Sequence, residues 1–333
     1  MRSPRRAPHS SERLQRYDFS FVHASFSTII FYFRQNNRTF AGKMEKNYYF
    51  KVAGHVFVVN NATADDITPW LDHYSPFRIE KTDEAPVFTL RVTERIKLED
   101  FQQEIHQDDD GSEIMAGTEK SGLPCFKFLL QGRHVATLLT DHEYREASVA
   151  MRAPKQFGLD NALMVMYALA TATRQTALFH SSVVSYQGRG YMFLGKSGTG
   201  KSTHSSLWLK HIEGTELVND DNPVVRVLSS GEIRVYGSPW SGKTPCYRNI
   251  DYPVGAIVLL SQAPYNRIEQ LVKLQAYAAI VPSISGKRWD KHIAEGLHLT
   301  ENLLAQHAPI YHLDCLPDED AARLCCKTVT NAQ

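Results

Sequence analysis

Residues 195–202 have the sequence Gly-Lys-Ser-Gly-Thr-Gly-Lys-Ser, which matches the pattern G-x-x-x-x-G-K-[ST] in full. An apolar run at 191–194 precedes this loop, and a run compatible with a helix follows it at 203–210. Its glycines can adopt positive φ angles, so the backbone can approach a ligand closely. The exposed amides and the positive end of the following helix favour an anion. The segment therefore predicts a phosphate-binding loop between a strand and a helix.

The side chains of this loop predict ATP and Mg²⁺ as its ligands. Lys201 supplies a point charge for the β- and γ-phosphates, and the Ser202 hydroxyl is a hard ligand that suits Mg²⁺. Lys196 is a further cation that either helps to hold the γ-phosphate or is simply solvated. The predicted nucleotide-binding residues are Gly195, Lys196, Ser197, Gly198, Thr199, Gly200, Lys201, Ser202 and Thr203.

Two adjacent aspartates follow the loop. The run 216–221 predicts a short strand that ends in Asp220 and Asp221. Only one helix and one return strand fit between Lys201 and Asp220, so the strand can end beside the loop. One carboxylate can then bind metal, and the other can accept a proton from an attacking hydroxyl. Asp-Asp-Asn-Pro also favours a turn, and both interpretations can hold together.

The whole chain has the composition of a soluble globular protein. Its 333 residues suffice for two ordinary domains or one large one, with 43% hydrophobic and 22% charged residues. The net charge of +1 gives no overall electrostatic attraction to nucleic acid or to an acidic membrane, so we expect neither as a partner. The five cysteines are scattered and form no C-x-x-C pair, which predicts neither a zinc site nor a disulfide framework. Reduced thiols in a cytoplasmic protein are the simplest interpretation.

The first 43 residues differ from the rest of the chain. Met44 begins a typical start and is followed at once by a strand-like run, so we expect residues 1–43 to be a non-native or disordered extension. Arginines before an aromatic stretch at 19–33 leave a signal or anchor segment as the alternative. That stretch is interrupted by polar residues and is shorter than the roughly 20 apolar residues of a spanning helix.

Residues 44–150 predict a β-rich N-terminal lobe with no chemistry that can be named. Strand-like runs lie at 48–59 with a turn at Gly54, at 88–92, at 125–130 and at 134–139. Asp108, Asp109 and Asp110 precede Gly111, but the later ligands of a calcium-binding EF-hand loop are missing. We therefore expect a solvated hairpin turn there.

Residues 151–333 predict a second, α/β domain with a mixed sheet around the phosphate loop. Apolar residues recur at helical spacing in 153–173. Strands are expected at 177–186, 191–194, 254–260 and 310–313, and amphipathic helices at 287–306 and 317–327.

One part of this domain resembles a known family. Phe179-His180-Ser181-Ser182-Val183-Val184, residues 190–194, the phosphate loop and residues 217–221 follow in the order and spacing of the bacterial HPr kinase/phosphorylase catalytic domain. ATP-dependent phosphoenolpyruvate carboxykinases share its fold core. The resemblance covers residues 178–227 and implies a P-loop kinase domain of the HPr kinase/phosphoenolpyruvate carboxykinase-like type.

The resemblance also implies roles for single residues. Asp220 corresponds to the general base and Asp221 to a metal ligand, although the two roles could be exchanged, and Asp220, Asp221 and Ser202 are together the candidate metal ligands. His180 corresponds to the family histidine near the reacting phosphate, and a buried structural histidine is the alternative. Independently of the resemblance, Arg248 and Arg267 are candidate phosphate clamps that could stabilise charge during transfer, with solvated surface charges as the alternative.

The sequence departs from the family after the aspartates. Residues 236–243, Tyr-Gly-Ser-Pro-Trp-Ser-Gly-Lys, replace the glycine-rich signature of true HPr kinases and resemble a segment of HPr-kinase-related proteins of unassigned substrate. Gly242 and Lys243 suit anion contact, and a surface turn anchored by a buried Trp240 is the alternative. The departure puts HPr in doubt as the substrate.

The predicted function is a kinase that transfers the γ-phosphate of ATP to a hydroxyl group, as in a serine kinase. The acceptor is open among an HPr-like protein, a peptide and free serine. One alternative is a nucleotide-binding regulatory or scaffold protein without turnover, and another is a phosphoenolpyruvate carboxykinase-like enzyme. The absence of an Asn-Lys-x-Asp motif weakens a GTPase interpretation. Reversal of the reaction and assembly into a homo-oligomer stay open.

Overall fold

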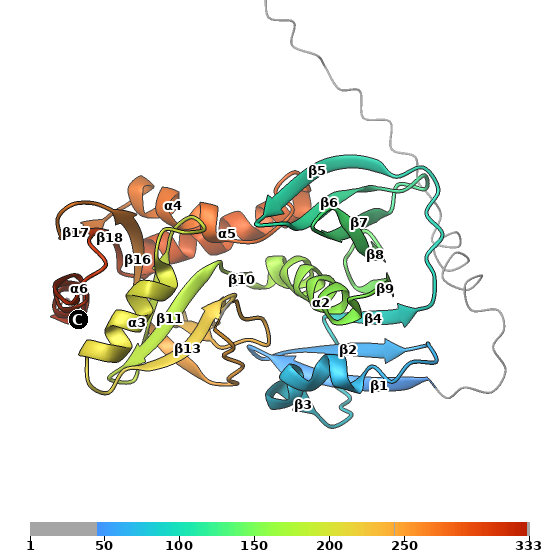
Figure 1. Ribbon diagram of the computed structural model, residues 1–333, viewed down its shortest axis with the longest axis horizontal. Coiled ribbons are helices and arrows are strands. Elements are labelled where there is room, and N and C mark those ends of the chain that lie inside the picture. The colour runs from blue at the N-terminus through green and yellow to red at the C-terminus, as the bar shows by residue number, and fades with distance from the viewer. Residues whose placement is uncertain (1–44, 243, 332–333) are drawn as a thin grey trace, which may run out of the picture. The chain divides into compact units, whose positions relative to one another are not determined.

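The computed structural model of the protein describes residues 45–242 and 244–331 (Figure 1). Met44–Gln333 form one compact unit. The expectations for residues 1–43 and for anion contact by Lys243 lie outside the described residues. Within the described ranges, no helix is both long and apolar enough to cross a membrane.

The N-terminal part of this unit is a mixed sheet of nine strands within the described residues. Strand β4 (Phe88–Thr93) runs parallel to both of its neighbours, β2 (His55–Asn61) and β9 (Glu146–Met151). All other neighbouring strands of this sheet are antiparallel. The strand-like runs predicted at 48–59, 125–130 and 134–139 are confirmed as strands, and they form the hairpins β1–β2 and β7–β8. In spatial order the strands are β3 (Arg78–Ile79), β1 (Lys46–Val52), β2 (His55–Asn61), β4 (Phe88–Thr93), β9 (Glu146–Met151), β8 (Arg133–Thr140), β7 (Pro124–Leu130), β6 (Ser112–Thr118) and β5 (Gln102–Asp109).

Helix α2 (Lys155–Thr171) packs on β8, β9 and β4 of this first sheet, beside the 3-10 helix η1 (Thr68–Phe77). The structure confirms the helix that the apolar spacing predicted within 153–173. The predicted domain boundary at residue 150 places this helix at the start of the second domain. Leu159, Leu163 and Met166 are fully buried in a core that continues from the first sheet into the second. The apolar residues of the two parts therefore form one core rather than two.

The second sheet also has nine strands within the described part of the chain. The pairs β12–β16 and β16–β18 are parallel, whereas β11 pairs antiparallel with both β12 and β13, so the predicted mixed sheet is confirmed. The main order is β10 (Thr176–Leu178), β14 (Val224–Val227), β15 (Ile233–Tyr236), β16 (Asp251–Gln262), β12 (Arg189–Leu194), β11 (Ser181–Tyr186) and β13 (Glu216–Asp221); β18 (Ile310–Cys315) pairs with β16 and with β17 (Arg267–Leu271).

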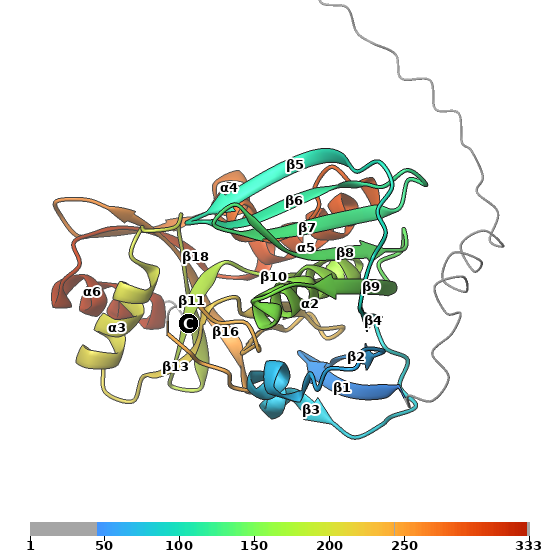
Figure 2. The same cartoon turned by 45° about the vertical axis from the view of Figure 1, so that its right-hand side comes forward.

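Helices cover the second sheet. Helices α3 (Lys201–His211) and α6 (Glu319–Asn331) lie side by side in Figures 1 and 2, and a small core around Trp208, Val258 and Cys325 joins them to the sheet. Helix α5 (Lys291–His307) packs on β10 and on the 3-10 helix η2 (Ala172–Arg174), next to α4 (Leu274–Ile280). The 3-10 helix η3 (Val281–Ser283) follows α4.

The strand predicted at 177–186 is interrupted. Its first part, β10, pairs with β14, and its second part, β11, pairs with β12 and β13. At the break, the Phe179 amide donates to the Pro223 carbonyl at 3.0 Å and the His180 amide donates to the Ser283 carbonyl at 2.7 Å. The chain thus changes its pairing partners within the sheet between β10 and β11, and His180 lies at this change.

Candidate functional site

The segment 195–200 forms a tight loop between β12 and α3. Gly195, Gly198 and Gly200 have φ angles of 150°, 78° and 110°, which side-chain-bearing residues rarely adopt. A Cβ atom at Gly195 would also lie 3.1 Å from the Thr199 Cβ. The loop therefore needs these glycines for its shape, and α3 begins directly behind it at Lys201. This geometry fits a cradle for phosphate groups at a helix N-terminus.

Lys201 lies within the curve of this loop. Its side-chain ammonium donates to the carbonyl of Gly195 at 3.1 Å and to that of Lys196 at 3.5 Å. Burial lowers the pKa of Lys201, and the nearby carboxylates of Asp221, Asp109 and Asp220 oppose that effect. The ammonium is thus held at the loop, where an anion would meet both it and the loop amides.

Asp220 lies beside the first turn of α3. The Ser202 hydroxyl donates to its carboxylate at 2.9 Å, and Asp220 is only 4% exposed. A hydroxyl and one carboxylate are a donor set that Mg²⁺ accepts when phosphate oxygens supply further ligands. Within the described residues, no three His, Cys, Asp or Glu side chains gather into a metal site, so the nucleotide would have to complete the coordination. The residues present fit that arrangement.

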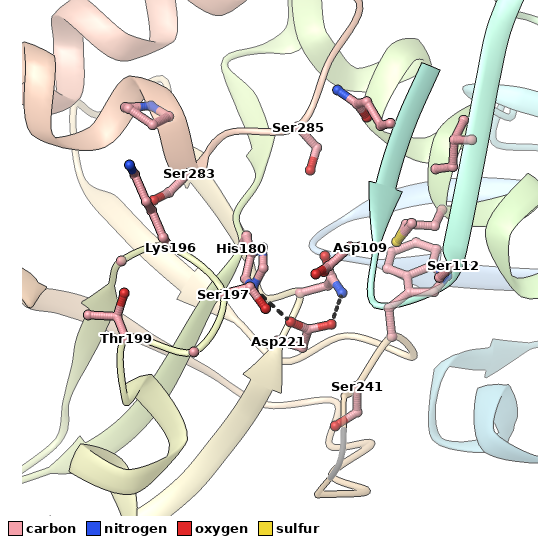
Figure 3. A pocket seen from close by; sticks show the side chains of 18 of the residues that line it. Asp109, Ser112, His180, Lys196, Ser197, Thr199, Asp221, Ser241, Ser283 and Ser285 are labelled. Carbon is pink, nitrogen blue, oxygen red and sulfur yellow. Dashed lines mark hydrogen bonds and ion pairs between the residues drawn. The ribbon is translucent and has the colours of Figure 1, made fainter. Parts of the chain in front are cut away.

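Asp221 points away from Asp220, toward His180. One carboxylate oxygen lies 3.3 Å from His180 Nε2, and the other accepts from the Asn222 side-chain amide at 2.8 Å (Figure 3). The φ angle of Asp221 is 130°, a region that costs energy for any residue except glycine. Successive side chains of a strand point to opposite faces, so each of the two neighbouring carboxylates has a different partner.

A network of hydrogen bonds holds the end of β13 in this conformation. The fully buried side chain of Asn219 donates to the Trp240 carbonyl at 3.1 Å and accepts from the Asn222 amide at 3.0 Å. The Gly242 amide donates to the Asp220 carbonyl at 2.7 Å. These contacts show how the surrounding chain stabilises a strained residue at the site.

The segment 237–242 is an anchored turn. Trp240 is 4% exposed, and its indole nitrogen donates to the Tyr74 hydroxyl at 3.0 Å. This arrangement favours the alternative interpretation, a turn fixed by a buried tryptophan. The turn fastens the end of β13 to the N-terminal sheet's core.

The surroundings of Asp221 also shift the pKa of its carboxyl group. Burial raises the pKa of Asp221, and the neighbouring carboxylates of Asp220 and Asp109 raise it too, whereas His180 and Lys201 oppose the rise. A raised pKa brings the carboxylate's pKa closer to the pH at which the protein works, which makes the carboxylate a more effective general base. Asp221 also lines the adjacent cavity, which Asp220 does not. The geometry therefore favours the exchanged assignment, with Asp221 as the base and Asp220 at the metal.

A cavity of about 1250 Å³ opens beside the loop. The loop from Gly195 to Thr199, His180 and Asp221 form one end, and the N-terminal sheet and α2 contribute the other, including Phe157 and Met164. The turn between β5 and β6 also lines it through Asp108 and Asp109. The sequence predicted only a solvated turn there, and residue patterns contain no signal that this turn meets a loop so distant in the chain.

The two predicted arginine clamps lie elsewhere. Arg248 donates to the Leu217 carbonyl at 2.6 Å and pairs with Glu216 at 2.8 Å, near the opposite end of β13 from Asp221. At about 3.3 Å per residue, that is roughly 13 Å away along the strand. Arg267 pairs with Glu269 at 2.9 Å and is exposed. The structure thus supports the alternative of surface charges for both.

Replacing His180 by glutamine is expected to move the acid limb of the pH profile of kcat/KM to higher pH. With Asp221 assigned as the base, proton acceptance requires its ionised form, so we expect activity to fall as pH drops through the pKa of Asp221. His180 lowers that pKa, and its removal therefore raises the pKa and moves the loss of activity upward. The profile is measured for His180→Gln beside His211→Gln, whose histidine pairs with Glu319 instead. An unchanged acid limb in His180→Gln would contradict the assignment.

Comparison with known proteins adds little. No protein-family model matches the chain, and no curated protein matches it. Among solved structures, it is similar to the Hpr(Ser) kinase/phosphatase from Coxiella burnetii, with 12% sequence identity and a TM-score of 0.28; the match covers 46% of this chain and 95% of that one. At this identity and TM-score the likeness supports no conclusion about activity, which has to rest on the site itself.

Proposed function

We propose that the protein is an ATP- and Mg²⁺-dependent phosphotransferase of HPr-kinase-like type, which transfers the γ-phosphate to a hydroxyl group. One observation supports this most directly. Beside a glycine-shaped phosphate loop, two adjacent carboxylates diverge, Asp220 to the Ser202 hydroxyl and Asp221 to His180 and the cavity. A kinase needs these two positions, one for the metal and one for the proton of the acceptor.

Each residue has a distinct task in this proposal. The loop amides and Lys201 bind the phosphates. Ser202 and Asp220 would hold Mg²⁺, which would supply positive charge to offset that of the phosphate oxygens. Asp221 accepts the proton of the acceptor hydroxyl while the oxygen of that hydroxyl forms a bond to the γ-phosphorus. The bond from that phosphorus to the bridging oxygen breaks, and ADP leaves. His180 orients the Asp221 carboxylate. Positioning and electrostatics supply most of the catalysis.

The carboxykinase alternative finds less support. Such an enzyme needs basic residues around a carboxylic-acid-derived substrate. Among the described residues that line the cavity, Lys196 is the one lysine and no arginine occurs. Lys196 belongs to the phosphate loop, so the remainder of the cavity lacks a permanent positive charge.

The test is transfer of label from γ-labelled ATP by the full-length protein. Free serine, HPr, peptides and a cell extract are offered as acceptors, with Mg²⁺ or with a chelator. We expect Mg²⁺-dependent label in one acceptor. If ATP binds tightly and no label reaches any acceptor, the protein is better described as a nucleotide-binding scaffold.

A further inference from the structure

We propose that the cavity binds, as phosphate acceptor, a small hydroxyl compound with a positively charged amine, and that Asp109 recognises this amine. The inference rests on the proposed function and names the class of its acceptor. It is drawn from the walls of the cavity beyond the phosphate loop.

The cavity has room for two molecules. Pockets for a single drug-sized ligand measure about 300–1,000 Å³, and this cavity measures about 1250 Å³. The phosphate loop forms only one end of it. The rest is bounded by the N-terminal sheet, α2 and the segment around Ser283 and Ser285. A second small molecule can therefore lie next to a nucleotide, with Asp221 between them.

A hydroxyl without a protein partner among the described residues lines the cavity as well. Ser283 is 6% exposed and lines the cavity, and its hydroxyl makes no hydrogen bond to any described residue. The hydroxyl of Ser285, two residues on, lines the cavity as well. The Ser283 hydroxyl is therefore available to hydrogen-bond a polar molecule in the cavity.

Asp109 lies across from these serines. In Figure 3, Lys196 and Asp109 lie on opposite sides of the His180–Asp221 pair, with Ser285 above. The Asp109 carboxylate forms no hydrogen bond or ion pair within the described part of the chain, yet its charge influences the pKa of both Lys201 and Asp221. It is therefore close to the reacting groups and free to pair with a ligand.

The turn that presents Asp109 is fixed in place. Glu104, on the same strand β5, pairs with Lys287 at 3.1 Å and accepts from the Trp289 indole nitrogen at 2.6 Å. The Lys287 side chain is only 7% exposed. Strand β5 is thus attached to the segment before α5, and the acidic turn belongs to the cavity wall rather than to a free loop.

The charges around the cavity favour a cation. Asp108, Asp109 and Asp160 line the part beyond the phosphate loop, together with His73, which pairs with Asp160 at 2.9 Å. An acceptor bearing only carboxylate or phosphate groups would meet these carboxylates without a compensating arginine or lysine. A cationic acceptor would be attracted by them, most strongly at low ionic strength because Asp108 and Asp109 are exposed.

Three acceptors that share a primary hydroxyl test the inference, namely L-serinamide (cationic), L-serine (zwitterionic) and glycerate (anionic). We expect kcat/KM for label transfer to fall in that order. Asp109→Asn should reduce the preference for serinamide over glycerate by about tenfold, as for the loss of one charge pair. Asp110→Asn is the matched control, because Asp110 is the next residue of the same turn and does not line the cavity.

Equilibrium binding provides the second readout. Calorimetry measures the binding of serinamide and glycerate to protein loaded with a non-hydrolysable ATP analogue. We expect serinamide to bind more tightly, with a preference that weakens at high salt and is lost in Asp109→Asn. Equal binding of both, no binding of either, or a preference untouched by Asp109→Asn would overturn the inference. Label that reaches only glycerate or only a protein would overturn the cationic acceptor but support the proposed phosphotransferase. Selective binding of serinamide without any transfer of label would refute the phosphotransferase and leave the binding preference standing.

Discussion

Asp221→Asn is expected to lower kcat for phosphoryl transfer by about 10²–10⁴-fold, the usual contribution of a general base. Asparagine has nearly the same shape, so the end of β13 should keep its hydrogen bonds, but an amide cannot accept the acceptor's proton. Asp221 makes no contact with Ser202, whose partner is Asp220. The affinity for ATP with Mg²⁺ should therefore change little. Steady-state kinetics and a nucleotide titration measure the two quantities separately.

The neighbouring variant Asp220→Asn is the matched control. It removes the carboxylate that receives the Ser202 hydroxyl, and it should raise the Mg²⁺ concentration needed for half-maximal activity. The two substituted aspartates are adjacent in the chain, but Asp220 faces Ser202 and Asp221 faces His180. If Asp221→Asn instead alters the Mg²⁺ requirement and Asp220→Asn abolishes transfer at saturating Mg²⁺, the roles are the reverse.

Lys201→Ala is expected to lower kcat/KM by at least about 10²–10³-fold, as found when one preorganised electrostatic donor is removed from a site. Lys201 is only 8% exposed. Its ammonium group donates hydrogen bonds to the carbonyls of Gly195 and Lys196 in the loop. Its removal leaves the phosphates without the point charge that offsets their own. A thermal melt checks that the variant stays folded.

Lys196→Ala tests the specificity of that effect. Lys196 belongs to the same loop and lines the cavity, but no hydrogen bond or ion pair to its ammonium holds it among the described residues. A mobile charge near solvent is screened, so its loss should cost no more than about tenfold. Equal losses in Lys196→Ala and Lys201→Ala would contradict a special position for Lys201.

The parts of the site that are local in sequence could be predicted from the sequence. The phosphate loop depends on glycines at fixed spacing, and the strand that ends in Asp220 and Asp221 must return beside the loop because so few residues lie between them. The sequence could not distinguish the two aspartates. Neighbouring side chains of a strand point to opposite faces, but which face meets Ser202 and which meets the cavity depends on contacts with segments distant in the chain.

The acceptor side of the site depends on long-range contacts and escaped prediction. Asp109 lines the same cavity as the phosphate loop, and it does so from the edge strand β5, which Glu104 attaches to Lys287. Arg248 was a reasonable candidate by position, yet Glu216 and the Leu217 carbonyl hold it near the other end of β13. No periodicity or motif encodes such pairings between residues far apart in sequence.

The division of labour between the two aspartates is tested most directly by single-turnover transfer from γ-labelled ATP, measured together with equilibrium ATP binding. Wild type, Asp220→Asn and Asp221→Asn are compared at several Mg²⁺ concentrations. We predict that Asp221→Asn binds ATP with Mg²⁺ as tightly as wild type and transfers almost no label at any Mg²⁺ concentration. Wild-type rates of transfer by Asp221→Asn would contradict the account.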